Sequence, residues 1–113
     1  MGLLVILNQG SEMEEIPMAE IYPSSLRQML GGEFQLAQVI YRQDGRYMAF
    51  NPESKECINE LATNLFQEFM RAMAPMLPIA AKKQHEFIRG KAIVFIDVSI
   101  GEYWTDVSEF WYH

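Results

Sequence analysis

The sequence predicts a single α+β domain: a mainly antiparallel sheet of about five strands, with one long amphipathic helix packed on one face and short additional helices. Short apolar runs bounded by turn-forming residues recur along the chain, and residues 57–73 repeat apolar side chains at helical spacing. The chain has 113 residues, 50% of them hydrophobic, and can bury one core without disulfide or metal support. Residues 1–113 are therefore assigned to one domain.

The first two expected strands form a hairpin. Residues 3–7 are a continuous apolar run, and the turn-forming segment 8–11 follows them. The next segment, 12–18, mixes acidic and apolar residues and contains Pro17, which cannot donate a ladder hydrogen bond and therefore favours a sheet edge or a strand end. Acidic side chains on an exposed edge also prevent edge-to-edge pairing with other molecules.

A short helix and a second hairpin are expected next. Pro23 suits the first turn of a helix, and the pair Gly31-Gly32 ends it. Residues 34–41 and 46–50 are rich in aromatic and β-branched residues, as strands are. They flank Gln43-Asp44-Gly45, where the Asp-Gly pair favours a tight hairpin turn.

The long helix is the element that the pattern defines best. We expect it to begin within residues 51–54, where Asn and Ser can cap the first N–H groups. Apolar residues at i, i+3 and i+4 then continue through 57–73 with polar residues on the other side. Pro75 and Pro78 end the helix, because proline breaks its hydrogen-bond ladder.

The segment after this helix carries three further signals. Met70, Met73 and Met76 crowd the end of the helix, where flexible side chains can line an adaptable groove or fill gaps in the core. Residues 79–86 are a weakly helical, basic connector. Residues 92–96 are almost wholly apolar, which predicts the central strand of the sheet.

The net charge of −6 is unevenly distributed along the chain. Residues 1–20 and residues 97–113 each contain four acidic residues and no Lys or Arg, whereas the middle of the chain carries a net charge of +2. Acidity repels phosphate backbones, so we expect no direct binding to nucleic acid. If the two ends meet in space, they form an acidic patch that attracts a basic partner or imitates DNA; a solvated face is the simpler interpretation.

Two further observations bear on the cellular location of the protein. No apolar run approaches the roughly 20 residues of a membrane span, and no basic region precedes the first apolar run. The single cysteine is usual for a reducing compartment. We therefore expect a cytoplasmic protein that does not interact with membranes.

The residues that could carry catalysis all have simpler structural interpretations. Cys57 falls on the apolar stripe of the expected helix, where cysteine packs as a small hydrophobe. Neither His85 nor His113 has a second ligand at metal-binding spacing. Since no phosphate-binding glycine motif is present either, we expect no enzymatic activity, no metal and no cofactor.

The carboxy-terminal residues 101–113 are the most aromatic part of the chain. Tyrosine and tryptophan supply much of the binding energy at protein interfaces, so we expect this segment and the acidic second strand to engage a protein partner or a second copy. The expected partner-binding residues are Tyr103, Trp104, Trp111, Tyr112, Glu14 and Glu15. Core packing of one or two of the aromatic side chains is the alternative.

A second function class is the binding or processing of a small anionic ligand between the long helix and the sheet. Arginine suits the recognition of carboxylate and phosphate groups because its planar guanidinium donates several parallel hydrogen bonds. The expected ligand-binding residues in this interpretation are Arg42, Arg46 and Arg89.

Several short segments are similar to those of a known family. They are residues 24–32, Asp44-Gly45, residues 59–62 and residues 87–94. In their order they resemble a family of small bacterial and phage-borne proteins classed only as a domain of unknown function. The resemblance implies a bacterial or mobile-element origin and carries no activity or catalytic residue. It makes a counter-defence protein or a regulatory inhibitor one concrete form of the expected protein-binding function.

Overall fold

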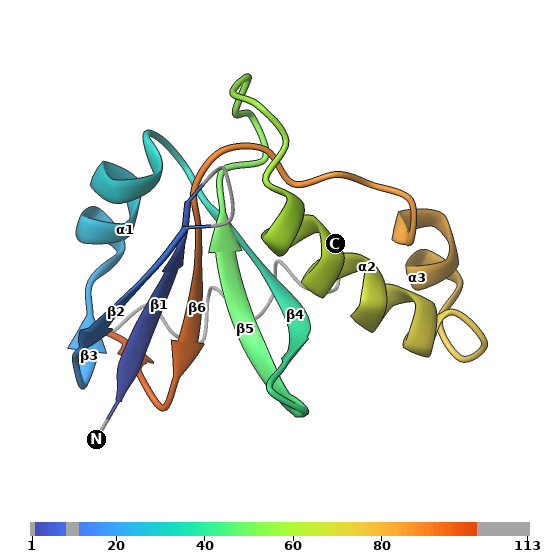
Figure 1. Ribbon diagram of the computed structural model, residues 1–113, viewed down its shortest axis with the longest axis horizontal. Coiled ribbons are helices and arrows are strands. Elements are labelled where there is room, and N and C mark those ends of the chain that lie inside the picture. Colours follow the sequence, from blue (N-terminus) through green and yellow to red (C-terminus); the bar gives the residue numbers. More distant parts are fainter. Residues whose placement is uncertain (1, 9–11, 102–113) are drawn as a thin grey trace.

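The computed structural model describes residues 2–8 and 12–101 and shows a twisted antiparallel sheet with a helix packed against each face (Figure 1). The predicted α+β class is confirmed. In chain order the elements are β1 (Leu3–Leu7), β2 (Met13–Pro17), β3 (Glu20–Ile21), α1 (Pro23–Leu30), β4 (Gln35–Tyr41), β5 (Asp44–Phe50), α2 (Glu60–Met73), α3 (Pro78–Lys83), β6 (Ala92–Ile96) and β7 (Ser99–Ile100).

The five long strands form one sheet in the order β2-β1-β6-β5-β4, with every neighbouring pair antiparallel. The two predicted hairpins, β1–β2 and β4–β5, make the two sides of this sheet, and β6 inserts between them. The predicted places of β6 at the centre and of β2 at an edge are both confirmed. The short strands β3 and β7 form a separate parallel pair that the sequence does not predict, since each has only two residues.

Each face of the sheet has its own hydrophobic core. On β1, Leu4 belongs to the same buried cluster as Leu26 of α1, whereas Val5 belongs to the same buried cluster as Phe66 of α2. Adjacent residues of a strand point to opposite faces. Strands buried on both faces need apolar residues at every position, which explains the uninterrupted apolar sequences of β1 and β6.

The predicted limits of α1 are confirmed. Pro23 occupies the first turn, and Gly31 caps the carboxyl end with φ of 78°, a left-handed conformation that glycine adopts without steric cost.

The β4–β5 hairpin turns earlier than the sequence predicts. Arg42 and Gln43 form the turn, with φ of 52° and 71°, while Asp44 and Gly45 belong to β5. The predicted turn at Gln43-Asp44-Gly45 is therefore wrong.

Burial of the two faces of β4 explains the observed register. A turn over residues 43–45 would place Gln38 opposite Phe50, where Gln35 lies in the structure. A register shift by an odd number of residues, here three, reverses the faces of a strand, so Gln38 would then lie on the face that α2 covers. In the observed register Gln38 lies opposite Tyr47 and donates a hydrogen bond to its hydroxyl at 3.5 Å. Ala37 and Val39 occupy the α2 face instead and are buried.

Replacing Gln43 with glycine is expected to raise the free energy of unfolding by about 0.5 kcal/mol, because glycine reaches this left-handed conformation without a clash of Cβ. Urea unfolding measures the difference. The matched variant Gln43→Ala keeps the Cβ atom and should bring no gain. Destabilisation by Gln43→Gly would contradict a turn at Arg42-Gln43.

The long helix begins later than predicted. It starts at Glu60, after an N-cap at Asn59, so the predicted start within residues 51–54 is wrong. Cys57 consequently lies before the helix and is exposed, which corrects its predicted burial on the apolar stripe. From Ala62 onward the stripe is confirmed, with buried residues facing the sheet, and the helix ends at Met73.

Candidate functional site

A groove of about 370 Å³ lies between α2, α3 and the edge strand β4. Its volume falls within the range of roughly 300–1,000 Å³ that ligand sites occupy. Apolar side chains from five different parts of the chain contribute to its lining: β4, β5, α2, α3 and the segment before β6. They include Leu36, Phe50, Phe66, Met70, Ala80 and Ile88.

Buried polar residues at the start of α2 hold one wall of the groove in place. The Asn59 side chain is fully buried and donates hydrogen bonds to the carbonyl oxygens of Leu7 at 2.9 Å and Gly90 at 2.8 Å. Its Oδ1 accepts a hydrogen bond from the backbone N–H of Ala62 at 3.1 Å, which caps the helix. One side chain therefore joins β1, α2 and the segment that precedes β6.

Thr63, one turn further along α2, holds Ile88 of the same segment in place. Its Oγ1 accepts a hydrogen bond from the N–H of Ile88 at 2.8 Å and donates one to the carbonyl oxygen of Ile88 at 3.3 Å. Ile88 is buried as a result, and Phe87 beside it points outward with 61% of its surface exposed. The groove wall is thus rigidly attached to the helix.

The rim of the groove exposes an unusual amount of apolar surface. Of the seven large hydrophobic residues that are exposed within the described ranges, four lie in residues 76–87. Their exposed fractions are 67% for Met76, 38% for Leu77, 38% for Ile79 and 61% for Phe87. Leu77, Ile79 and Phe87 line the groove itself. Clustered exposure of this kind marks an interaction surface, whereas single exposed apolar residues are ordinary.

The groove also carries a lysine that has no anionic partner among the described residues. Lys83 lines the groove and is half-buried, and no hydrogen bond or ion pair engages its ammonium group within the part of the chain that the structure describes. Arg89, also in the lining, donates a hydrogen bond to the carbonyl oxygen of Glu56 at 3.3 Å. Partial burial weakens the hydration of a charge, so an anionic group near Lys83 is favoured.

The edge strand β4 forms a further wall of the groove. Residues Gln35, Leu36 and Ala37 of β4 line the groove, and β4 has no strand on its outer side among the described residues. Alternate backbone N–H and C=O groups of an edge strand point away from the sheet. The charged side chains of the lining are those of Lys83, Arg89 and Glu86, which give it a net charge of +1. The groove therefore offers apolar contacts, a small excess of positive charge and an unpaired strand edge in one place.

The expected partner-binding residues on the acidic second strand lie elsewhere. Glu14 and Glu15 are exposed on β2, at the edge of the sheet opposite β4 in the strand order. Glu15 forms an ion pair with Arg42 at 3.3 Å. The other expected partner-binding residues, Tyr103, Trp104, Trp111 and Tyr112, lie outside the described residues.

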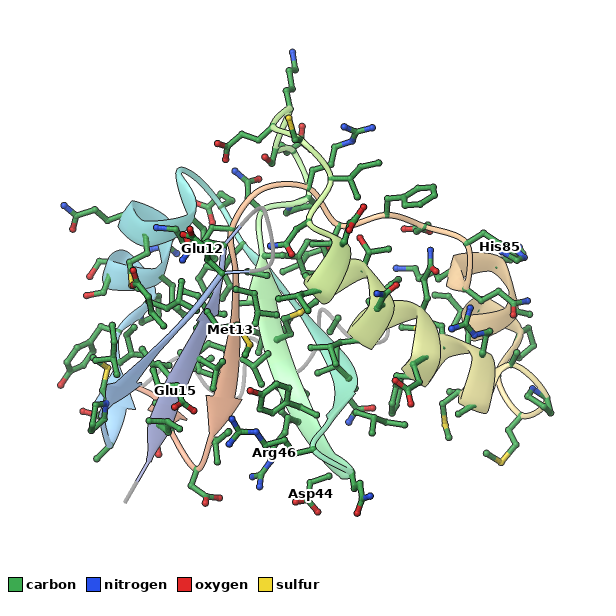
Figure 2. The ribbon with its side chains drawn as sticks, in the orientation of Figure 1. Glu12, Met13, Glu15, Asp44, Arg46 and His85 are labelled. Atoms are coloured by element: carbon green, nitrogen blue, oxygen red, sulfur yellow. The ribbon has the colours of Figure 1, made fainter. Side chains whose placement is uncertain are left out.

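Two of the three arginines expected to bind an anion are paired with carboxylates. Arg42 pairs with Glu15, and Arg46 pairs with Asp44 at 3.6 Å and with Asp97 at 3.5 Å. Figure 2 shows Arg46 and Asp44 together near the β4–β5 turn, away from α3. Of the three, only Arg89 lines the groove.

Among the described residues, those considered for catalysis form no recognisable constellation, and His113 lies outside the described residues. Cys57 is exposed in the segment before α2, and His85 is exposed just after α3, on the far side of the molecule from Glu15 (Figure 2). Within residues 2–8 and 12–101, no three His, Cys, Asp or Glu side chains are grouped as a metal site requires. None of the helices in those ranges is long and apolar enough to cross a membrane.

Sequence reasoning anticipated part of the groove. The methionine cluster was one signal, since Met70 lines the groove and Met76 is exposed beside it. The run Leu77-Pro78-Ile79 was a second signal that was missed: apolar residues in a short, basic connecting segment have no core of their own to enter. These residues are exposed because they lie in or directly before α3, a six-residue helix in which only Ala80 is buried.

No protein-family model, curated protein or solved structure matches this chain. Its function is therefore argued from the geometry of the groove.

Proposed function

We propose that this chain is a small binding module without enzymatic activity, and that the groove between α2, α3 and β4 receives an apolar segment of a protein partner. The observation that carries the proposal is the cluster of exposed apolar side chains in residues 76–87 around a preformed hollow. Covering such a surface removes apolar area from water, at roughly 25 cal/mol for each Å² buried. Rigid attachment of the wall through Asn59 and Thr63 lowers the entropic cost of binding.

The proposal extends the expectations from the sequence. A regulatory or counter-defence inhibitor acts by occupying a partner's surface, so it needs a docking site and no catalytic group. We place the protein in the cytoplasm, where the exposed thiol of Cys57 stays reduced.

Selection from a phage-displayed library of random peptides tests this function without knowledge of the partner. Peptides rich in aromatic or large aliphatic residues, with an acidic residue for Lys83, are expected to be enriched on the wild-type protein. The variant Ile79→Asp should lose these peptides, because it places a carboxylate in the apolar lining.

The matched control is Met13→Asp, which changes an exposed apolar residue of β2 in the same way but away from the groove. It should keep the wild-type peptides. Enrichment of the same peptides on Ile79→Asp would show that the groove is not a peptide-binding site. The same conclusion follows if no peptide is enriched on a chain in which Phe110→Ser, Trp111→Ser and Tyr112→Ser remove its own aromatic segment as a competitor.

A further inference from the structure

We infer that the groove receives residues 102–113 of a second copy of this chain, so that two chains exchange these segments and form a dimer. The inference rests on the proposed function, because it names the occupant of the same groove. Residues 102–113 lie outside the described part of the chain. They contain five aromatic residues and three acidic residues, with no Lys or Arg.

The chemistry of this segment matches the groove on two counts. The triplet Phe110-Trp111-Tyr112 supplies the large, rigid side chains that fill apolar pockets at interfaces, with little loss of conformational entropy. Glu109 directly precedes the triplet and brings a carboxylate to the groove, where the half-buried ammonium of Lys83 has no anionic partner among the described residues. An acidic, aromatic segment can therefore cover the apolar lining and also place a carboxylate near the ammonium group of Lys83.

The edge strand adds a third match. Residues of β4 line the groove, and a segment in an extended conformation can hydrogen-bond to the outward N–H and C=O groups of an edge strand. Its alternate side chains would then point toward the apolar lining.

The place where the described chain ends favours a second copy over the chain's own segment. β7 pairs with β3, and Ile100 belongs to the core on the α1 face, whereas Phe66, Met70 and Ile88 of the groove belong to the core on the α2 face. The nine residues 102–110, which lead from the described chain to the triplet, reach about 30 Å when fully extended. Because the sheet separates these two cores, the chain's own triplet would have to pass around the sheet to reach the groove, in a domain that measures 34 × 31 × 27 Å.

A second copy delivers the segment without that constraint. If each chain places its segment in the groove of the other, the assembly closes with two-fold symmetry, as most homodimers do. The two contacts are then identical and reinforce each other.

Light scattering combined with size-exclusion chromatography of full-length chains tests the exchange. The wild-type chain is expected to have twice its chain mass of 13.1 kDa. Ile79→Asp removes the receptor surface, and the triple change Phe110→Ser, Trp111→Ser and Tyr112→Ser removes the inserted segment. Each variant alone is expected to raise the dimer dissociation constant by about 30-fold or more, as loss of an interface anchor does.

A mixture of the two variants is the decisive arm of this experiment. The Ile79→Asp chain keeps its segment and the triple variant keeps its groove, so mixing should restore a 1:1 dimer with one of the two contacts. Because this dimer lacks the second contact, it should bind more weakly than the wild-type dimer but more tightly than either variant alone. If the mixture associates no more tightly than either variant alone while the wild-type chain is dimeric, the dimer forms through another surface and the inference is wrong. A wild-type monomer also overturns it, whether the groove is empty or holds the chain's own segment.

Two controls keep these outcomes interpretable. Circular dichroism checks that each variant is folded. Lys83→Glu serves as a second groove variant, because it reverses one charge of the lining and leaves the apolar side chains unchanged. Failure of the exchange leaves the proposed function intact if display-selected peptides bind the groove of the triple variant, which no aromatic segment can fill. Failure of both experiments removes the groove as a binding site.

Discussion

Replacing Asn59 with alanine is expected to lower the free energy of unfolding by about 3 kcal/mol. The change deletes the helix cap, and it leaves the carbonyl oxygens of Leu7 and Gly90 without their side-chain donor. A buried carbonyl that loses its donor bears the full cost of desolvation. Urea unfolding followed by circular dichroism measures the difference.

The matched control is Asn64→Ala, which removes the same side chain from an exposed position of α2. Its effect should stay within about 0.5 kcal/mol, as is usual for exposed positions. Asn59→Asp keeps the cap acceptor but loses both donated hydrogen bonds, so it should also be strongly destabilised. Equal effects of Asn59→Ala and Asn64→Ala would contradict the role given to Asn59.

Replacing Gly90 with alanine is expected to destabilise the protein by about 2 kcal/mol. Gly90 has φ of 76°, and an added Cβ would lie 2.7 Å from Ser54 Oγ and 2.9 Å from Glu56 Oε2. Its N–H also donates a hydrogen bond to the carbonyl oxygen of Cys57 at 3.0 Å, so a shift of the backbone would disturb the groove wall. The measurement is again the free energy of unfolding in urea.

Two other glycines separate the causes of this effect. Gly31 has a similar φ of 78° but open space around its Cβ position, so Gly31→Ala reports the conformational penalty alone. Gly45 has open space and no positive φ, so Gly45→Ala should change stability least. If Gly90→Ala is no worse than Gly31→Ala, the close approach of Ser54 and Glu56 has no energetic consequence.

Local patterns were sufficient to predict most of the fold. The apolar runs of β1 and β6, Pro17 in β2 and the Pro23–Gly31 limits of α1 each reflect a constraint that acts within a few residues. They predicted the hairpins, the edge strand, the central strand and the first helix correctly.

The errors arose where tertiary packing decides between local alternatives. The Asp-Gly pair favours a turn, but burial of Ala37 and Val39 under α2 sets the register that puts Arg42 and Gln43 there. Residues 51–54 contain suitable caps, yet Asn59 caps the helix because its amide also meets two carbonyls from distant parts of the chain. Neither of those carbonyls is adjacent in sequence to Asn59.

The candidate site was predicted only in fragments for the same reason. Arg89 and the methionine cluster were singled out, but the groove needs β4, α2, α3 and the segment before β6 to come together. No single stretch of sequence carries that arrangement. The apolar residues of 76–87 carry a signal in the sequence, because they stand in a short connecting segment, but only the structure shows that most of them line one groove.

The most direct test of the groove as a binding surface is a titration of the isotope-labelled protein with a display-selected peptide, followed by amide chemical shifts. We expect the largest shifts in residues 35–37, 77–83 and 86–89, which contribute most of the lining of the groove. Shifts centred on Glu14 and Glu15 of β2, with the groove residues unchanged, would contradict the account.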